Sequence, residues 1–225
     1  IYEFEEKPKK PKSTKASMGI YVFTWSKLKD YLKEDEENPK SSKDFGKNVL
    51  PHMLNSGEKM FAYEFNGYWK DVGTIESLWE ANMDLLAPNT QLNLHDETLK
   101  IYSRTPGMPP HYIAEGSSVQ NSLVAEGCNI YGNVDFSVLF DGAYIAPNAI
   151  VRDSIIMPGA KVLDGAIVQY SIICENAVIG QNAKIGDRPE NIKNAKAWGI
   201  TVIGDNVKIS RDIKIEAKST ISEDM

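Results

Sequence analysis

The sequence predicts two structures in succession: an α/β segment over residues 1–86 and a three-sided parallel β-coil over residues 117–225. In the first stretch, β-rich runs alternate with runs whose apolar residues follow a helical period. In the second, an aliphatic residue returns every five or six positions. Residues 87–116 are polar and rich in proline, which predicts a linker. A chain of 225 residues accommodates one large or two small domains.

Three helices are expected in the first segment. One covers residues 25–34, and a second starts near Ser42 or Asp44 and ends at Gly57, a natural C′ residue. Pro51 should bend or shorten the second helix. Thr74 is a good N-cap for the third helix. The apolar stripes that predict these helices are Trp25, Leu28, Tyr31 and Leu32; Phe45, Val49, Leu50, Met53 and Leu54; and Ile75, Leu78, Trp79, Met83 and Leu86.

Two strands complete the predicted α/β pattern. The runs are Ser17–Phe23 and Met60–Phe65, both rich in β-branched or aromatic residues. Strands that alternate with helices in this way are typical of the later part of an α/β domain.

The repeat in the second segment has two periods. The aliphatic positions are Ile145, Val151, Ile156, Val162, Val168, Ile173, Ile179 and Ile185, and then Ile203, Ile209, Ile215 and Ile221. A longer repeat begins at Ser122, Ser137, Ser154 and Ser171, and turn-forming residues fill the intervals. A six-residue period suits neither a helix nor a plain alternating strand.

A coil with three flat faces explains both periods. Each face takes one hexad, the aliphatic side chain points inward, and small residues occupy the corners. The sequence therefore predicts a left-handed parallel β-helix of hexapeptide repeats. The interruption at 186–199 should form a projecting loop. Cys128 and Cys174 are expected to be small packing residues.

The composition excludes several classes of protein. The net charge is −6 with no basic block, which argues against nucleic acid as a partner. No apolar run is long enough to span a membrane, and no signal peptide is recognisable. Two distant cysteines form no disulfide framework, which fits a reducing, cytoplasmic setting. His95 and His111 have no neighbours suited to a metal site. Because the first residues resemble the end of a strand, we expect this chain to be a fragment.

Two short stretches carry the candidate chemistry. Asp71 lies on a loop or strand end directly before the third helix, where a carboxylate can bind a cation or a ligand. It can equally cap the helix or pair with a lysine, and spacing alone leaves both readings open. The acid–amine pair Glu6-Lys7, stiffened by Pro8, can bind a sugar phosphate, with hydroxyls on the acid and phosphate on the amine.

An α/β segment followed by a hexapeptide coil suggests the sugar-nucleotide pyrophosphorylases or the hexapeptide acyltransferases. The motifs resemble those of the glucose-1-phosphate adenylyltransferase family over essentially the whole chain. They are Glu6-Lys7-Pro8, Ala16-Ser17-Met18-Gly19-Ile20-Tyr21-Val22-Phe23, Asp44-Phe45-Gly46-Lys47, Tyr68-Trp69-Lys70-Asp71-Val72-Gly73-Thr74, Trp79-Glu80-Ala81-Asn82-Met83-Asp84-Leu85 and Ser103-Arg104. The Gly-rich nucleotide loop of that family is absent from these residues.

The resemblance implies a reaction and roles. The family transfers AMP from ATP to glucose 1-phosphate and releases pyrophosphate, supplying ADP-glucose for glycogen. Glu6, Lys7 and Ser17 would bind glucose 1-phosphate, Lys7 and Asp71 would be catalytic, and Asp71 would hold Mg²⁺. The family also implies an allosteric enzyme that forms homotetramers, or heterotetramers with a paralogous subunit. With half of a substrate site, the 225-residue chain alone is expected to be inactive.

Two alternatives remain at the level of the sequence. A regulatory or assembly subunit of the same family would keep the fold without catalysis, although the presence of Lys7 and Asp71 favours a catalytic type. A hexapeptide acyltransferase usually needs a histidine near the coils, and residues 117–225 contain none.

Overall fold

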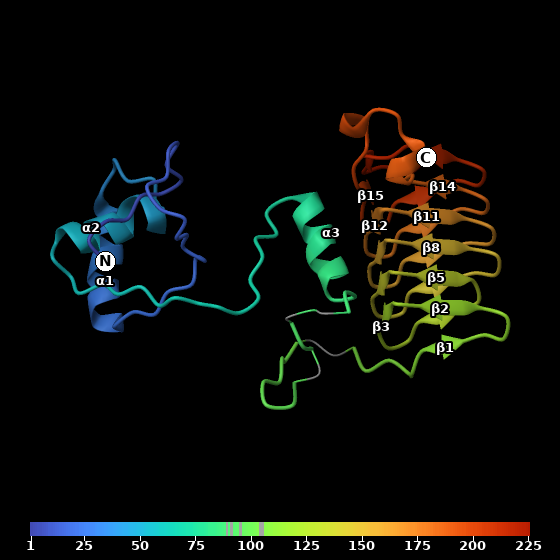
Figure 1. Ribbon diagram of the computed structural model, residues 1–225, viewed down its shortest axis with the longest axis horizontal. Helices are drawn as coiled ribbons and strands as arrows, with labels where there is room; N and C mark the ends of the chain where they lie inside the picture. The colour runs from blue at the N-terminus through green and yellow to red at the C-terminus, as the bar shows by residue number, and fades with distance from the viewer. Residues whose placement is uncertain (89, 91, 95, 104–105) are drawn as a thin grey trace. The chain divides into compact units, whose positions relative to one another are not determined.

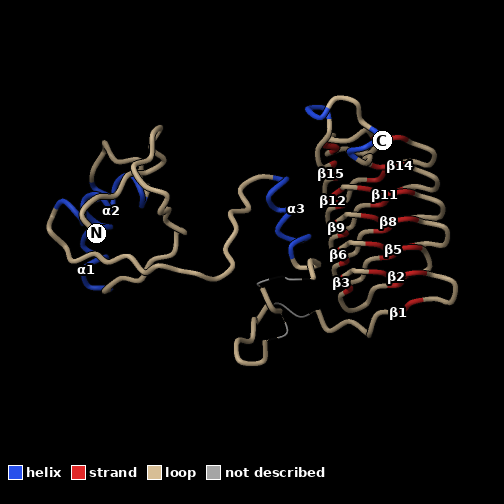
Figure 2. The backbone as a smooth tube through the Cα atoms, in the orientation of Figure 1, coloured by secondary structure: helices blue, strands red, loops and turns tan. Residues whose placement is uncertain are grey.

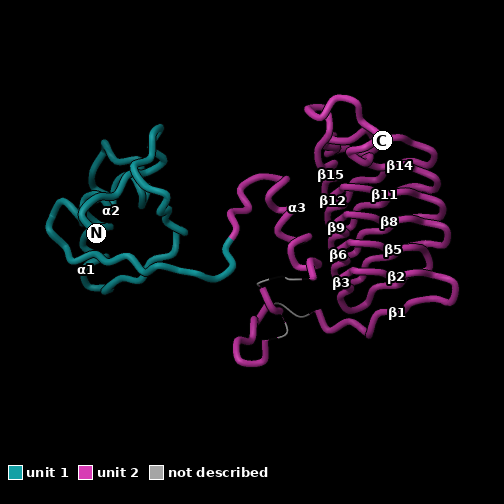
Figure 3. The backbone as a smooth tube through the Cα atoms, in the orientation of Figure 1, with its two compact units in different colours: residues 1–69 teal, residues 70–225 magenta. Residues whose placement is uncertain are grey.

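A computed structural model describes residues 1–88, 90, 92–94, 96–103 and 106–225. His95 and Arg104, which figured in the sequence interpretation, lie outside the described residues. The chain forms two compact units, residues 1–69 and 70–225 (Figure 3), and each is described by itself. The domain boundary that the sequence predicts at residue 86 was placed from sequence motifs, whereas these two units are defined by contacts. That boundary therefore stays a prediction.

Unit 1 is built around short helices (Figure 2). The helix predicted at 25–34 is confirmed as α1, Trp25–Glu37. The second predicted helix begins after Asp44 as the π-helical turn η1, Phe45–Val49, and continues as α2, Leu50–Asn55. Pro51 lies in the first turn of α2, directly after the π-helical turn η1. Gly57, with φ of +78°, ends this helix as predicted.

The two predicted strands of unit 1 are wrong for this structure. Residues 17–23 and 60–65 are all described, and none is in a strand. A strand exists only when a neighbouring strand accepts and donates its backbone hydrogen bonds. Unit 1 supplies no such neighbour, and Val22, Phe61 and Tyr63 are 99%, 87% and 89% exposed. Apolar alternation alone therefore did not produce strands.

Helix α3, Ile75–Asp84, belongs by its contacts to unit 2. The predicted N-cap is confirmed: Thr74 Oγ1 accepts a hydrogen bond from the Ser77 amide, and Ser77 Oγ accepts one from the Thr74 amide. This reciprocal capping box fixes where the helix begins.

The remainder of unit 2 is a parallel β-helix of three six-stranded sheets (Figure 1). Sheet A contains β1 (Tyr112–Ile113), β4 (Asn129–Ile130), β7 (Tyr144–Ile145), β10 (Lys161–Val162), β13 (Val178–Ile179) and β16 (Lys208–Ile209). Sheet B contains β2 (Ser118–Gln120), β5 (Asn133–Asp135), β8 (Ile150–Arg152), β11 (Ile167–Gln169), β14 (Lys184–Ile185) and β17 (Lys214–Ile215). Sheet C contains β3 (Leu123–Val124), β6 (Val138–Leu139), β9 (Ile155–Ile156), β12 (Ser171–Ile173), β15 (Thr201–Ile203) and β18 (Thr220–Ile221).

The aliphatic repeat forms the core, as the sequence predicted. In sheet C, for example, Ile156 pairs with Ile173, which pairs with Ile203 in the next coil. These three side chains are fully buried, as are most of the predicted inward positions. Cys128 is also fully buried, and burial raises the pKa of both the Cys128 and Cys174 thiols. Both cysteines are free, in keeping with a packing role.

The serine repeat forms a hydrogen-bonded ladder at the corner between sheets B and C. Ser137, Ser154 and Ser171 are fully buried. The Ser154 hydroxyl donates to the Arg152 carbonyl at 2.6 Å and accepts from the Ser171 amide at 3.2 Å. Each coil is thereby tied to the next by a side chain as well as by the sheets.

The residue before each of these serines has a left-handed backbone. The φ values are +43° at Phe136, +47° at Asp153 and +45° at Tyr170. An aromatic residue rarely adopts this conformation, which costs roughly 1–2 kcal/mol relative to the right-handed region. The fold holds two bulky rings at this corner despite that cost.

The predicted interruption after Gly186 is confirmed as a loop that carries two short 3₁₀ turns, η2 (Pro189–Asn191) and η3 (Ala195–Ala197). The coil resumes in register beyond it, because Thr201 pairs with Ser171. The first strand, β1, lies inside the stretch predicted as a linker.

Candidate functional site

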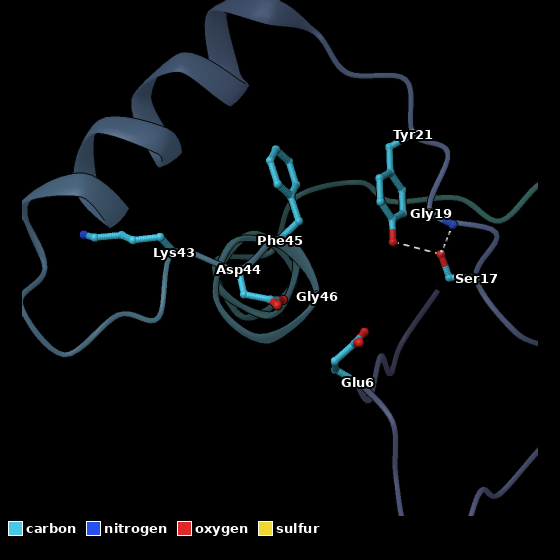
Figure 4. Close-up of a pocket in the computed structure, with 8 residues that line it drawn as sticks. All are labelled: Glu6, Ser17, Gly19, Tyr21, Lys43, Asp44, Phe45 and Gly46. Atoms are coloured by element: carbon cyan, nitrogen blue, oxygen red, sulfur yellow. Dashed lines mark hydrogen bonds between the residues drawn. The ribbon is translucent and has the colours of Figure 1, made fainter. Parts of the chain in front are cut away.

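Unit 1 contains a pocket of about 480 Å³ (Figure 4). Two predicted sugar-site residues, Glu6 and Ser17, line it together although they come from separate turns of the chain. Their neighbours around the pocket are Gly19, Tyr21, Lys43, Asp44, Phe45 and Gly46.

The Ser17 side of the pocket is organised by hydroxyl groups. Ser17 Oγ accepts a hydrogen bond from the Gly19 amide at 3.1 Å and lies 2.8 Å from the Tyr21 hydroxyl. The Tyr21 ring stacks on Phe45, with centroids 6.5 Å apart and planes 9° apart. One side of the pocket therefore combines two hydroxyls with a flat aromatic wall.

The pocket lining also includes two carboxylates, those of Glu6 and Asp44. The Glu6 side chain is only 27% exposed and packs against Gly46, where a Cβ would overlap its carboxylate. A side chain at position 46 would displace the Glu6 carboxylate from this position. Asp44, the residue before η1, caps that turn by accepting a hydrogen bond from the Lys47 amide at 2.9 Å. Carboxylates and hydroxyls beside an aromatic face suit the hydroxyls and the apolar ring face of a sugar.

Lys7 lies next to the pocket but is not among its lining residues. Its side chain is 89% exposed, and its ammonium is 3.8 Å from Glu6 Oε1. The left-handed backbone at Lys7, with φ of +49°, turns the chain directly after Glu6. The predicted contact of Lys7 with a phosphate is compatible with this exposure and stays a prediction.

Asp71 lies in unit 2, on the segment that leads into α3. Its Oδ1 accepts from the Gly73 amide at 2.9 Å. The sequence left open that Asp71 caps the helix or pairs with a lysine. In the structure, Thr74 caps the helix, and Lys70 pairs with Glu80 and Asp84. The hydrogen bond to Asp84 raises the pKa of Lys70. Since Lys7 and Asp71 belong to different units, their joint action stays a prediction.

The exposed Asp71 carboxylate is a suitable hard oxygen donor for Mg²⁺. Mg²⁺ is commonly held by one or two carboxylates plus substrate phosphates, rather than by a complete protein cage. Among the described residues, no group of three or more His, Cys, Asp or Glu side chains could hold a metal ion. A single carboxylate is compatible with Mg²⁺ bound in that way, and the binding of Mg²⁺ by Asp71 stays a prediction.

Sequence reasoning named only Glu6 and Ser17 among the residues that line the pocket and missed the other six, which include Tyr21, Asp44 and Phe45. Tyr21, Asp44 and Phe45 all stood in motifs of the family resemblance, and Asp44 and Phe45 also in the second predicted helix, but none was assigned to a site. The available signal for Tyr21 was its position four residues after Ser17, but the wall that it forms with Phe45 depends on the fold.

Two protein families match successive parts of the chain. Residues 1–87 match the nucleotidyl transferase family, and residues 112–203 match the GlmU-like C-terminal hexapeptide family. The second match coincides with most of the β-helix. As for membranes, no helix in the described part of the chain has both the length and the apolar character of a span.

Curated relatives carry a common name. A glucose-1-phosphate adenylyltransferase of Clostridium perfringens (strain SM101 / Type A) is 61% identical over 187 residues, 83% of this chain and 48% of that protein. Proteins of the same name from Desulforamulus reducens and Bacillus cereus (strain ATCC 14579) are 50% and 59% identical, over 92% and 72% of this chain and 52% and 43% of those proteins. The chain spans about half the length of the curated relatives it matches. Over the stretch that it spans, this chain is a close sequence relative of the glucose-1-phosphate adenylyltransferases.

Proposed function

We propose that this chain supplies the sugar-phosphate side of a nucleotidyl transferase site that makes ADP-glucose and pyrophosphate from ATP and glucose 1-phosphate. The observation that supports it most is the pocket that unites Glu6 and Ser17 with an aromatic wall. The name shared by relatives of 50–61% identity gives the substrates.

In this proposal each side chain has one task. Glu6 and Ser17 bind hydroxyls of the glucose ring, and Lys7 neutralises the phosphate. A phosphate oxygen of glucose 1-phosphate attacks the α-phosphorus of ATP, and pyrophosphate leaves. That nucleophile is already anionic, so no strong general base is needed, and positioning with charge neutralisation carries the reaction. Bound Mg²⁺ would supply further neutralisation of phosphate charge, with Asp71 as its protein ligand.

The biological setting belongs to the same proposal. ADP-glucose is the donor for glycogen, and a cytoplasmic, allosteric homotetramer or heterotetramer is the assembly that the family resemblance suggests. The net charge of −6, with no basic block in the sequence, argues against nucleic acid as a partner.

A chimera tests the proposal directly. This chain would replace the matching 187 residues of the Clostridium perfringens relative, and ADP-glucose formation would be measured with ATP, Mg²⁺ and glucose 1-phosphate. We expect turnover, and we expect Lys7→Ala to cost about 2–4 kcal/mol in kcat/KM for glucose 1-phosphate, because it removes a charge-assisted contact. Lys9→Ala, two residues away, is the matched control and should change little.

Binding to the 225-residue chain gives a second readout. Glucose 1-phosphate should shift the amide resonances of Ser17, Gly19 and Gly46, whereas inorganic phosphate should leave Ser17 and Gly19 in place. A folded chimera that binds ATP yet makes no ADP-glucose, or a Lys7→Ala chimera with unchanged kcat and KM, would overturn the assignment.

A further inference from the structure

The segment that carries Asp71 runs back along α3 and is fastened to it at several points. The Lys70 ammonium lies 2.9 Å from Asp84 Oδ2 and 3.1 Å from Glu80 Oε2, both in the second half of the helix. Asp71 Oδ1 accepts from the Gly73 amide, and Thr74 caps the first turn. The Asp71 carboxylate is therefore held in a fixed relation to α3.

Helix α3 in turn packs against sheet C of the β-helix (Figure 1). Its buried Met83 and the partly buried Leu78 join a cluster with Val138, Ile155 and Ile172, outward-facing residues of β6, β9 and β12. This cluster is separate from the interior core of the coil. Sheet C thus has two apolar faces, one for the coil and one for the helix.

Trp79 is the most specific contact between the helix and the coil. Its indole Nε1 donates to the Asp153 carbonyl at 2.7 Å, across 74 positions of sequence. Its ring lies 5.8 Å from Tyr170, and Tyr170 lies 5.4 Å from Trp198 in the loop after Gly186, measured between ring centroids. Trp198 is itself fixed, because its Nε1 donates to the Asp187 carbonyl at 2.9 Å.

The docking site of Trp79 is the strained corner of the coil. Asp153, whose carbonyl receives the indole, has a left-handed backbone, and so do Phe136 and Tyr170, which stand one coil before and one coil after it. Both of those rings belong to the cluster under α3. Strain of this kind persists where the surrounding structure requires the conformation. The same conformation recurs at Asn121, one coil before Phe136, so it belongs to the turn of the coil, and α3 docks on the surface that this turn presents.

We propose that Trp79 is a positioning residue for Asp71: by fastening α3 to the corner formed by Phe136, Asp153 and Tyr170, it makes the β-helix the support that sets the place of this carboxylate. The functional part of this inference rests on the proposed function. The mechanical part does not, because it concerns only contacts within unit 2. It assigns to the β-helix a direct part in shaping the metal-binding side of the reaction.

Hydrogen exchange in the 225-residue chain tests the mechanical part. The reporters are the Gly73 amide, bonded to Asp71, and the Ser77 amide, bonded to Thr74. We expect Trp79→Ala to speed exchange of both by about tenfold or more, because α3 loses its anchor. The Lys161 amide, bonded to Ala177 inside the coil, should be unaffected. Trp25→Ala is the matched control, since Trp25 is 66% exposed on unit 1.

Trp79→Phe separates packing from hydrogen bonding. It keeps an aromatic ring against Tyr170 and removes the bond to Asp153, so exchange at Gly73 should lie between that of the unchanged chain and that of Trp79→Ala. Unchanged exchange at Gly73 and Ser77 in the folded Trp79→Ala chain would overturn the anchor.

The chimera tests the consequence for the site. Trp79→Ala should raise the Mg²⁺ concentration for half-maximal rate by about tenfold, an effect typical of residues that orient a metal ligand. The KM for glucose 1-phosphate should change by less than about twofold, because the pocket of unit 1 is untouched, and Trp79→Phe should restore most of the Mg²⁺ response. A uniform loss of activity without a change in Mg²⁺ dependence would overturn the positioning role. An inactive parent chimera would instead count against the proposed function, and the exchange experiment would still decide the anchor.

Discussion

The two units of this chain differ in where their apolar residues find partners. In the β-helix, each inward aliphatic residue stacks on its equivalent one coil away, and the side chains of the central coils are fully buried. In unit 1, the apolar runs around Val22 and Phe61 stay exposed, and Val49, Leu50 and Met53 are its buried hydrophobic residues. A short-range repeat therefore provides the packing partners of its own apolar residues. Strand-forming runs need a partner strand, and unit 1 does not contain one.

The sharpest test of this comparison removes one apolar side chain from each unit. Ile173→Ala should lower the free energy of unfolding by about 2–5 kcal/mol, because it leaves a cavity between Ile156 and Ile203. Val22→Ala should change it by less than about 0.5 kcal/mol, since that side chain is already in water. Denaturant titration followed by circular dichroism measures both. Equal effects would show that the two regions do not differ in packing as described.

A glycine pair tests the tightness of the coil corners. Gly186 and Gly116 both have positive φ, of +71° and +81°, so alanine strains both. A Cβ at Gly186 would also overlap the Gln169 carbonyl oxygen and lie 2.6 Å from Ser171 Oγ, whereas one at Gly116 meets nothing within 4 Å. We expect a loss of about 2–3 kcal/mol for Gly186→Ala and about 1 kcal/mol for Gly116→Ala. Thermal unfolding of the two variants side by side decides whether the close approach matters.

Serine occupies contrasting places in the two units. Ser154→Ala removes the acceptor for the buried Ser171 amide, so we expect a loss of about 1–3 kcal/mol. Ser17→Ala removes an exposed hydroxyl and should alter stability by less than about 0.5 kcal/mol. The same variant should weaken glucose 1-phosphate binding in the proposed pocket. Calorimetric unfolding measures the stability of both variants, and ligand titration measures their binding of glucose 1-phosphate. A larger loss of stability for Ser17→Ala than for Ser154→Ala would contradict the prediction.

The smallest expected effect concerns the charge at the strained corner. Burial, and then the nearby Asp135 carboxylate, raise the pKa of Asp153, against the opposing influence of Arg188 and Arg152. The folded protein thus holds this proton more tightly than the unfolded chain does, and ionisation of Asp153 disfavours the fold as the pH rises through the folded pKa. Asp153→Asn keeps a residue that tolerates a left-handed backbone and removes the charge.

We therefore expect Asp153→Asn to raise Tm modestly at about pH 7 and to lose that advantage towards about pH 4, where the native carboxyl is increasingly protonated. Parallel melts across this range measure the difference. A constant or inverted gap would mean that the charge of Asp153 is not the destabilising element.

Sequence reasoning succeeded where the relevant contacts are local. The hexad spacing predicted the coil because a residue such as Ile173 meets Ile156, its equivalent in the neighbouring repeat. Thr74 predicted the start of α3 because a cap acts within one turn. The strands at 17–23 and 60–65 were wrong because strand formation depends on a distant partner. At the pocket, the acid of Glu6 was visible in the sequence, but the stacking of Tyr21 on Phe45 was not.

The continuity of the corner across the loop after Gly186 has a consequence for how such proteins can change. Thr201 takes its place beside Ser171 as though the intervening residues were absent. The β-helix therefore accepts an insertion at this corner without a shift in the register of the coils on either side. A peptide inserted in this loop would lie near Trp198 and Tyr170, the aromatic residues beside Trp79 of α3. The surroundings of α3 can therefore be varied while the β-helix stays the same.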